Sequence, residues 1–303
     1  MNEQTPRRAH SLEELAQLQA RAFSADEIAA SIGGFRPRPT DIVISPYSKC
    51  GTTWLQQTFH CLRTRGDMDF DDISRVVPWI ETAVTCDLDL DAAQHGEPRG
   101  FKSHLSYDRM PKGGRYVVAF RDPKDAMVSL FRFMEGWFIE PGAVAIGEFA
   151  AARLASRSQG NNYWDHLVSW WDQRDNADVL LLSYEDMTAN PADNVRRLAA
   201  FCGIALDDEL LALTLDRSSL GFMLRYKDRF DDLMMRQVSE RRCNLPSGSD
   251  SAKVRQGGVG GHRQAMPPEL EAQMDAVWAE TVAPKLGFVD YAAFETALRA
   301  RRT

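Results

Sequence analysis

Three short apolar runs, each followed by a helical pattern, organise the middle of the chain. They are DIVIS (residues 41–45), RYVVAF (115–120) and DVLLLSY (178–184). A near-continuous apolar run indicates a strand buried on both faces, which is typical of parallel sheets covered by helices. The pattern therefore predicts an α/β fold in which a central parallel sheet carries helices on both faces.

Capping residues mark where the helices after these strands begin and end. Asp122 and Asn190 are each followed by a proline, a pair that supplies an N-cap and a first-turn residue without an N–H. The helical pattern after Asn190 stops at Gly203, a residue suited to a helix C-terminus. Strand and helix thus alternate from residue 41 onward.

The N-terminal region predicts a helical arm in front of this core. Ser11 with Glu14, and Ser24 with Glu27, form two capping-box signatures, each opening a short helical pattern. The chain has 303 residues, a length that single α/β domains reach. We predict one domain over 1–303, with the arm over 1–36 and the core over 41–290.

The charge balance excludes several classes of protein. Lys and Arg number 36 against 43 Asp and Glu, for a net charge of −7, which disfavours general binding to nucleic acid or anionic membranes. No segment approaches the roughly 18 apolar residues of a membrane span, and the polar start lacks the apolar stretch of a secretory signal. We therefore expect a cytoplasmic protein with no membrane span and no nucleic-acid partner.

The five cysteines do not form a metal-binding or disulfide pattern. Their spacing is wide, their number is odd, and no C-x-x-C pair or nearby histidine set accompanies them. We expect reduced thiols and no structural metal. Cys61 and Cys202 lie within helical apolar patterns and are expected in the core.

The loop after the first apolar run, SPYSKCGTTW, has the residues of an anion site. Such a loop presents free backbone N–H groups at the positive end of a helix dipole. Gly51 allows close approach, Thr52 and Thr53 add hydroxyls, and Lys49 adds a positive charge. An ordinary turn with a solvated lysine is the alternative. A nucleoside-triphosphatase loop is disfavoured, because Thr52 stands where its lysine would follow the second glycine.

The sequence resembles the cytosolic-type sulfotransferases, which transfer a sulfuryl group from 3′-phosphoadenosine 5′-phosphosulfate (PAPS). KCGTTW is similar to that family's K-S-G-T-T-W loop, with Cys50 in place of serine and Ser48 in place of the usual proline. The resemblance extends from about residue 41 to 288, through FKSHL, AFRDPKDAMVSLF, NNYWDHLVSWW, LLSYEDMTANP and KVRQGG in the same order. It implies a P-loop-like loop that binds the phosphosulfate.

The resemblance assigns the donor to particular residues. It implies that the 5′-phosphosulfate is held by Lys49, Cys50, Gly51, Thr52, Thr53 and Trp54, with Trp54 against the adenine. Arg121 and Ser129 match the family's pair for the 3′-phosphate, and Tyr184 matches its adenine-contacting tyrosine.

Two segments of the donor site depart from the family pattern. SSLGFM, which includes Ser218, Leu220 and Met223, resembles T-S-F-x-x-M but has Leu220 in place of the phenylalanine, a loss of stacking of about 1 kcal/mol. Arg255, Gln256 and Gly257 match R-K-G, with a neutral Gln256 in place of the charged residue, which weakens one phosphate contact.

The resemblance also places catalytic groups in FKSHL. His104 matches the family's catalytic base, and an imidazole with a pKa near 6.5 can take the proton of an alcohol as the O–S bond forms. Lys102, two residues earlier on the same extended face, can stabilise negative charge on the transferring group, as can Lys49. The predicted catalytic set is His104, Lys49, Lys102 and Ser129.

The acceptor pocket is expected from variable segments 70–84, 133–149 and 226–244. Their aromatic residues predict an apolar or aromatic hydroxyl acceptor, although such a stripe at helical spacing is often core. These residues are Trp79, Phe133, Trp137 and Phe138. The charged stretch 226–251 predicts a mobile surface segment, part of which could close over the site and exclude water.

Two other functions remain possible on the sequence alone. A nucleotide-dependent kinase would require Mg²⁺ and prefer a nucleoside triphosphate. A non-catalytic nucleotide-binding protein on the same fold is consistent with Leu220 and Gln256, but Lys49 and His104 count against it. The family's C-terminal dimer segment is not recognisable after Arg263, so a dimer of that kind is doubtful.

Overall fold

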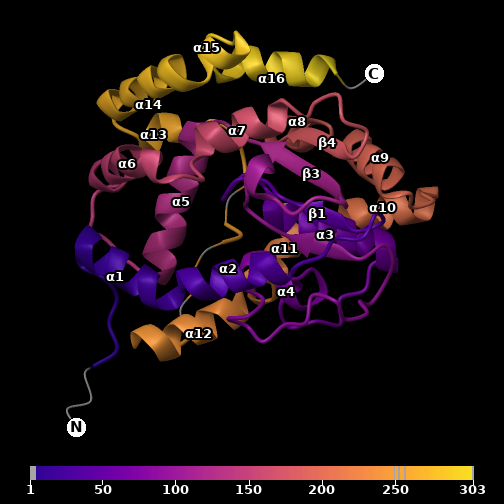
Figure 1. The fold of residues 1–303 in the computed structure, drawn as a ribbon, viewed down its shortest axis with the longest axis horizontal. Helices are drawn as coiled ribbons and strands as arrows, with labels where there is room; N and C mark the ends of the chain where they lie inside the picture. The colour runs from indigo at the N-terminus through magenta and orange to yellow at the C-terminus, as the bar shows by residue number, and fades with distance from the viewer. Residues whose placement is uncertain (1–4, 249, 252, 256, 302–303) are drawn as a thin grey trace.

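A parallel sheet lies at the centre of the computed structural model, which describes residues 5–248, 250–251, 253–255 and 257–301 (Figure 1). Within these residues the sheet has four strands in the order β2-β1-β3-β4. The strands are β1 (Ile42–Ile44), β2 (Gly100–Lys102), β3 (Arg115–Phe120) and β4 (Val179–Ser183). The predicted α/β fold with a central parallel sheet is confirmed.

The three predicted apolar runs form adjacent strands, and FKSHL supplies the edge strand β2. Val43 of β1 is in register with Phe101 of β2 and Tyr116 of β3. All pairings are parallel, so the carboxyl ends of the described strands meet at one edge of the sheet. The loop after β1 and the segment after β2 therefore emerge side by side.

Helices cover both faces of the sheet, as the apolar runs predicted. Ile42, Ile44 and Val117 point to one face, in a core cluster with residues of α3 (Thr52–Thr64), α9 (Pro191–Cys202) and α10 (Asp208–Arg217). Alternate residues such as Val43 and Val118 point to the other face. The helices there are α5 (Pro123–Trp137), α7 (Tyr163–Trp171), α14 (Pro268–Thr281) and α16 (Tyr291–Ala300).

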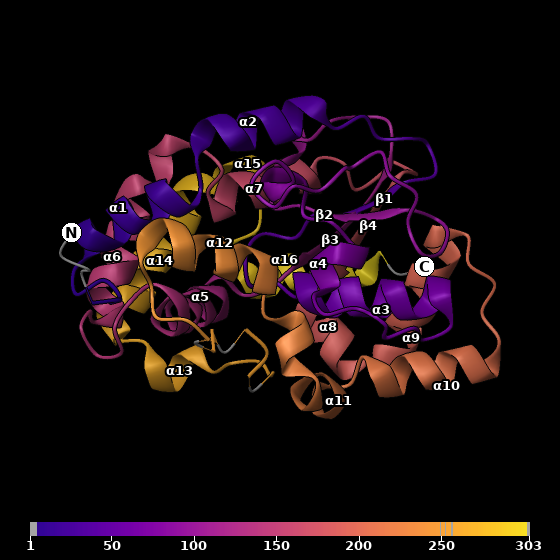
Figure 2. The same cartoon turned by 90° about the horizontal axis from the view of Figure 1, so that it is seen from below.

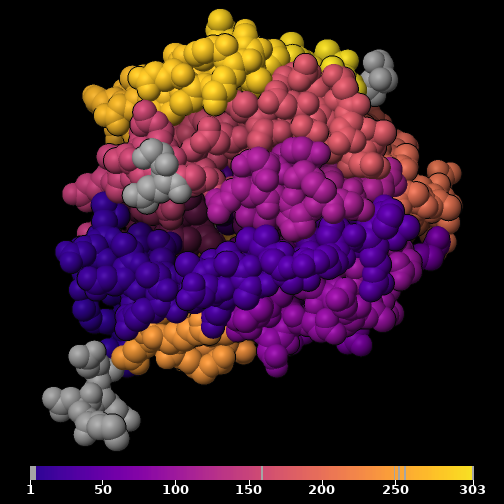
Figure 3. Space-filling view, viewed as in Figure 1, coloured from indigo at the N-terminus to yellow at the C-terminus, as the bar shows by residue number. Residues whose placement is uncertain are grey.

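The N-terminal arm consists of α1 (Leu12–Ala22) and α2 (Ala25–Gly34). Ser11 and Ser24 cap them by accepting from the backbone N–H of Glu14 and Glu27, as predicted. In the space-filling view the arm forms a dark blue band across the molecule, above the orange residues of α12 (Leu233–Cys243) (Figure 3). The other α-helices are α4 (Ile73–Val76), α6 (Ile146–Ala155), α8 (Tyr184–Ala189), α11 (Leu220–Arg225), α12 (Leu233–Cys243), α13 (His262–Ala265) and α15 (Ala283–Leu286).

The charged stretch 226–251 is not the surface loop that the sequence suggested. It contains a short 3-10 helix (Lys227–Phe230) and then α12, which packs against α1. Met235 and Val238 are buried, and Ser239 accepts a hydrogen bond from Trp137 Nε1 at 2.8 Å. Its buried charges are paired, Arg236 with Asp231 inside the stretch and Asp232 with Lys102 and Lys253 outside it. The chain between α12 and α13 then runs beside α5 (Figure 2).

Candidate active site

One cavity of about 980 Å³ opens where the carboxyl ends of β1 and β2 meet the start of α3. This edge is where ligands bind in open α/β sheets. The cavity brings together most of the residues predicted from the sequence. Those that line it are Lys49, Gly51, Thr52, Thr53, Trp54, Lys102, His104, Arg121, Ser129, Tyr184, Ser218, Leu220, Met223, Arg255 and Gly257. Gln256 lies outside the described residues.

The loop after β1 ends in a helix start that no side chain caps. Gly51 is the N-cap of α3 with a left-handed φ of 93°, and no side chain among the described residues caps the first-turn N–H groups. A Cβ at this position would approach the Tyr184 ring to 3.0 Å, so glycine is required for space as well as for backbone angle. The Thr52 hydroxyl is buried without a hydrogen-bond partner among the described residues. The loop is thus arranged for an anion.

Lys49 projects from this loop into a setting that disfavours its charge. Its Nζ lies 3.4 Å from the Lys253 carbonyl oxygen and 4.3 Å from the centroid of the Phe133 ring. Burial, and then the neighbouring Lys253 ammonium, lower the pKa of Lys49 to about 7. An anionic ligand would reverse this shift, because it replaces the lost solvation of the ammonium.

Cys50 differs from the neighbouring loop residues because its side chain points away from the cavity. Its side chain is fully buried in the core beneath the loop, and burial raises its thiol pKa to about 12. It does not line the cavity. The predicted contact of Cys50 with the donor is therefore limited to its backbone, because the thiol fills core space in the tight turn.

His104 is held in one tautomer with a free nitrogen. Its Nδ1 lies 2.8 Å from the Pro46 carbonyl oxygen, which can only accept, so Nδ1 carries the proton and Nε2 the lone pair. Its backbone N–H donates to Glu81 at 2.7 Å, and the Trp79 ring packs against the imidazole at 5.3 Å. Burial and then Lys102 lower the pKa of His104 to about 3. The imidazole is therefore neutral, with the lone pair on Nε2.

Lys102 lies beside His104 and is paired with a carboxylate that no sequence motif had marked. Its Nζ donates to Asp232 Oδ1 at 3.1 Å and lies 3.8 Å from the centroid of the Trp79 ring. Burial lowers the pKa of Lys102 to about 8, although Asp232 opposes this effect. The predicted juxtaposition of Lys49, Lys102 and His104 around one cavity is observed.

Arg121 joins the loop to the C-terminal part of the site. Its guanidinium donates to the carbonyl oxygens of Lys49 at 3.0 Å and Gly258 at 3.1 Å, and lies 4.4 Å from the centroid of the Tyr184 ring. Its buried Nε has no hydrogen-bond partner among the described residues. Ser129 lines the same cavity from α5. Arg121 and Ser129, the two residues predicted to hold the 3′-phosphate, therefore line the same cavity.

An aromatic corner lies next to the loop. Trp54 and Tyr184 meet edge to face with ring centroids 5.8 Å apart. Leu220 is 40% exposed and Met223 is buried, and both line the cavity on the same side as Ser218. The Ser218 hydroxyl donates to the Thr214 carbonyl oxygen at 2.6 Å, which leaves its oxygen free to accept. A planar base fits this corner better than a branched chain.

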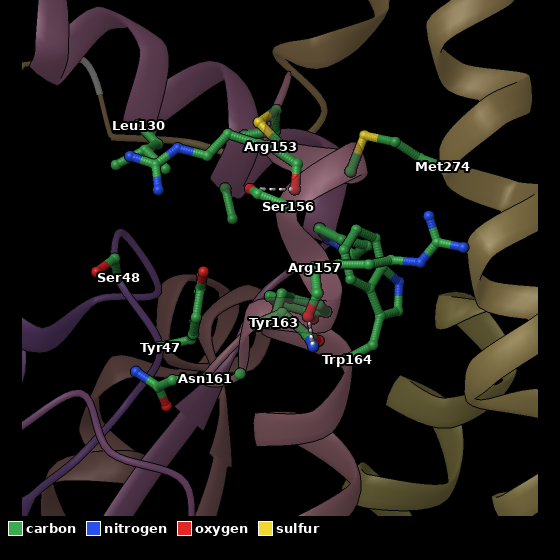
Figure 4. A pocket seen from close by; sticks show the side chains of 15 residues that line it. Tyr47, Ser48, Leu130, Arg153, Ser156, Arg157, Asn161, Tyr163, Trp164 and Met274 are labelled. Atoms are coloured by element: carbon green, nitrogen blue, oxygen red, sulfur yellow. Dashed lines mark hydrogen bonds between the residues drawn. The ribbon is translucent and has the colours of Figure 1, made fainter. Parts of the chain in front are cut away.

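No role was predicted from the sequence for five charged residues that line the cavity, namely Asp125, Arg132, Arg153, Asp232 and Lys253. Arg153 also lines a smaller neighbouring cavity of about 90 Å³, where its side chain extends from α6 toward Ser48 and Leu130 (Figure 4). Arg132, Arg153 and Asp232 lie outside the quoted motifs, and the motif that contains Lys253 marked only its neighbours. Their position depends on packing between distant segments.

The end of the cavity near α1 is apolar. Trp79, Phe133 and Trp137 line it, as predicted for the acceptor pocket, and Phe23 of α1 adds a further ring. Phe138 is wrong as a lining residue, because it is fully buried behind Trp137, with ring centroids 4.9 Å apart. It belongs to the core cluster that supports the pocket.

Two features are absent from the described residues. No helix there is long and apolar enough to cross a membrane. No group of three or more His, Cys, Asp or Glu side chains there is arranged to hold a metal ion.

The sequence profile of the sulfotransferase domain matches residues 39–285. The chain belongs to the sulfotransferase family. This confirms the resemblance, which had been drawn from residue 41 to 288, and the enzyme is a sulfotransferase whose sulfuryl donor is PAPS.

Curated relatives of this sulfotransferase have similar lengths. It is 29% identical over 212 residues to mouse sulfotransferase 1 family member D1, covering 66% of this chain and 72% of the relative. It is 22% identical over 264 residues to rabbit amine sulfotransferase, covering 84% of each.

Solved structures share the fold. A retinol dehydratase in complex with retinol and adenosine 3′,5′-bisphosphate (PAP) has a TM-score of 0.68 at 19% identity, covering 91% of this chain and 96% of that one. A mouse sulfotransferase complexed with PAP has a TM-score of 0.67 at 21% identity, covering 92% and 95%.

Proposed function

We propose that this sulfotransferase transfers the sulfuryl group of PAPS to the hydroxyl of a small apolar or aromatic acceptor, with His104 as general base. The observation that supports this most directly is the convergence of Lys49, Lys102 and the free Nε2 of His104 on one cavity. That cavity also contains an uncapped helix start for the phosphosulfate.

The donor is assigned to groups that line the cavity. The first-turn N–H groups of α3 and the Thr52 hydroxyl would hold the 5′ end, together with Lys49. Arg121 and Ser129 would hold the 3′-phosphate, with Arg255 and Gly257 from the C-terminal segment. Trp54, Tyr184 and Leu220 would enclose the adenine.

The proposed chemistry is an in-line displacement at sulfur. The acceptor oxygen forms a bond to sulfur while His104 Nε2 takes its proton, and the bond from sulfur to the bridging oxygen of the 5′-phosphate breaks. PAP leaves with the electron pair of that bond. Lys102 stabilises negative charge on the sulfuryl oxygens, and Lys49 neutralises the bridging oxygen, contributions of about 3 kcal/mol each by analogy with oxyanion-hole donors.

The acceptor is assigned only by class. The end of the cavity nearest His104 is lined by aromatic rings, which favour an acceptor with an apolar ring over a charged acceptor. These rings belong to Phe23, Trp79, Phe133 and Trp137. Two fold neighbours are retinol dehydratase complexes with retinol or androsterone, both hydroxylated apolar molecules. We also place the protein in the cytoplasm, because its composition is polar and relatives include a cytosolic sulfotransferase of Arabidopsis thaliana.

A ligand comparison tests the proposal. Thermal shifts with PAP and with ATP plus Mg²⁺ should show stabilisation by PAP alone, and PAPS labelled with ³⁵S should then transfer label to a hydroxylated apolar acceptor in a screen. A larger shift with ATP and Mg²⁺ would instead support the kinase alternative. Binding of PAP with no transfer to any hydroxylated acceptor would support the non-catalytic alternative.

A further inference from the structure

Asp232 is a buried carboxylate held between two lysines in the active-site cavity. Its Oδ1 accepts from Lys102 Nζ at 3.1 Å, and its Oδ2 lies 2.6 Å from Lys253 Nζ. The side chains of Lys102, Asp232 and Lys253 are only 2%, 4% and 8% exposed. Lys102 comes from β2, Asp232 precedes α12, and Lys253 follows it, so three separate segments meet at this point.

Lys253 is also connected to the loop lysine. Its carbonyl oxygen accepts from Lys49 Nζ at 3.4 Å, while its side chain reaches Lys102 through Asp232. Lys253 is thus the one residue among those described that contacts Lys49 directly and shares a carboxylate with Lys102. Its segment spans the distance between the two proposed catalytic lysines.

The cluster carries an excess of positive charge that a carboxylate alone does not balance. Lys49, Lys102 and Lys253 surround Asp232, and the next carboxyl group is Asp72, whose pKa is raised by burial and by Asp232. Each ammonium has three N–H donors, and Asp232 occupies one on Lys102, whereas the Lys253 Nζ is close to Asp232 but has no hydrogen-bond partner among the described residues. The remaining donors line a cavity, where buried positive charge requires an anionic ligand.

We propose that Lys253 contacts the sulfuryl group of the donor, and that Asp232 is a positioning residue that holds Lys253 and Lys102 on either side of it. The proposal rests on the function proposed above and gives a role to a residue of KVRQGG to which the resemblance assigned none. PAP retains both phosphates of the donor but lacks the sulfuryl group. Lys253 therefore lets the enzyme distinguish the loaded donor from the spent one.

Binding measurements with the two nucleotides test the role of Lys253. Lys253→Met keeps the length of the side chain and removes its charge. The Kd for PAPS should rise at least tenfold in this variant, while the Kd for PAP changes less than threefold. Lys227→Met is the matched control, because it removes the same charge from an exposed lysine of the neighbouring segment, and both of its constants should stay at wild-type values. If Lys253→Met raised the Kd for PAPS and the Kd for PAP by the same factor, or changed neither, the assignment of Lys253 to the sulfuryl group would be overturned.

The role of Asp232 is tested by the pH dependence of PAPS binding. Asp232 opposes the lowering of the Lys102 pKa, so Asp232→Asn should lower that pKa further below about 8. The titratable groups that face Asp232 and Lys102 are Lys253, Asp72, Lys49, His104 and Cys86. PAPS affinity in Asp232→Asn should then begin to fall at least one pH unit lower than in the wild type, and Asp232→Glu should restore the wild-type profile. A loss of the same factor at every pH would indicate only a structural role.

These outcomes are separable from failure of the proposed function. If wild-type protein binds neither PAP nor PAPS, the proposed function fails and the inference about Lys253 fails with it. If wild-type protein binds both and Lys253→Met does not separate them, the proposed function stands and the inference about Lys253 is wrong.

Discussion

Binding of PAP at alkaline pH is expected to take up a proton on Lys49. The pKa of Lys49 is lowered to about 7, first by burial and then by Lys253. At pH 8 a group with that pKa is about one-tenth protonated. A 5′-phosphate beside the ammonium raises the pKa again, because an opposite charge favours the charged form. Lys49 should therefore take up about 0.9 proton per PAP bound.

The proton uptake on Lys49 also makes the affinity for PAP depend on pH. The complex holds more protons than the free enzyme wherever the pH lies above the free pKa and below the bound pKa. PAP affinity should consequently fall as the pH rises above 7, by close to tenfold per pH unit if Lys49 dominates. At pH 7 the uptake should be about half a proton, since half of the free Lys49 is already charged.

Titration calorimetry in two buffers of different ionisation enthalpy, such as Tris and HEPES at equal pH, measures this uptake. Lys49→Met is the decisive variant, because it removes the titrating group and keeps the apolar contact with Phe133. The uptake at pH 8 should drop by about 0.9 proton in Lys49→Met. The same uptake in variant and wild type would refute the reasoning, as would an uptake that does not decrease between pH 8 and pH 7.

Four further substitutions test other parts of the site. His104→Ala should reduce kcat by about 10²- to 10⁴-fold and leave the Kd of PAP within twofold; substantial remaining turnover of a hydroxyl acceptor would exclude the base role. Arg121→Ala should raise the Kd of PAP by roughly 10- to 100-fold and that of adenosine 5′-monophosphate much less, because the second ligand lacks the 3′-phosphate; an equal loss would indicate only collapse of the loop. Leu220→Phe should tighten PAP by about fivefold through an added aromatic face, and weaker binding would contradict the adenine assignment. Gly136→Ala places a Cβ 2.6 Å from the backbone of Ser251, so the Tm should fall despite the better helix propensity of alanine, and an unchanged Tm would show that the segment yields freely.

The sequence correctly predicted the strands and helix starts that depend only on neighbouring residues. The apolar runs around β1, β3 and β4 gave correct strands, because a strand buried on both faces has no polar positions. The N-caps Ser11, Ser24 and Asp122 were correct, since each side chain accepts from an N–H two or three residues away. Asn190 precedes its helix as predicted, but no side-chain cap bond forms there.

The stretch 226–251 shows where local reasoning failed. Its charges suggested exposure, but Arg236 and Asp231 neutralise each other within the protein, and the apolar residues between them pack toward α1 and α5. The prediction that Phe138 lines the pocket was also wrong, here because the residue is buried. An aromatic residue beside a pocket can equally belong to the core that supports the pocket. Neither result depends on local propensity.

The sequence alone determined the strand, loop and helix that present Lys49, and the extended segment that presents Lys102 and His104, because each unit is set by neighbouring residues. Only the tertiary structure decided what surrounds them. Asp232 is 130 residues from Lys102 along the chain, and Lys253 is 204 residues from Lys49. Electrostatic energy depends on distance and burial, so the pKa values of these groups, and the excess of charge that draws an anion into the cavity, arise when the segments pack together.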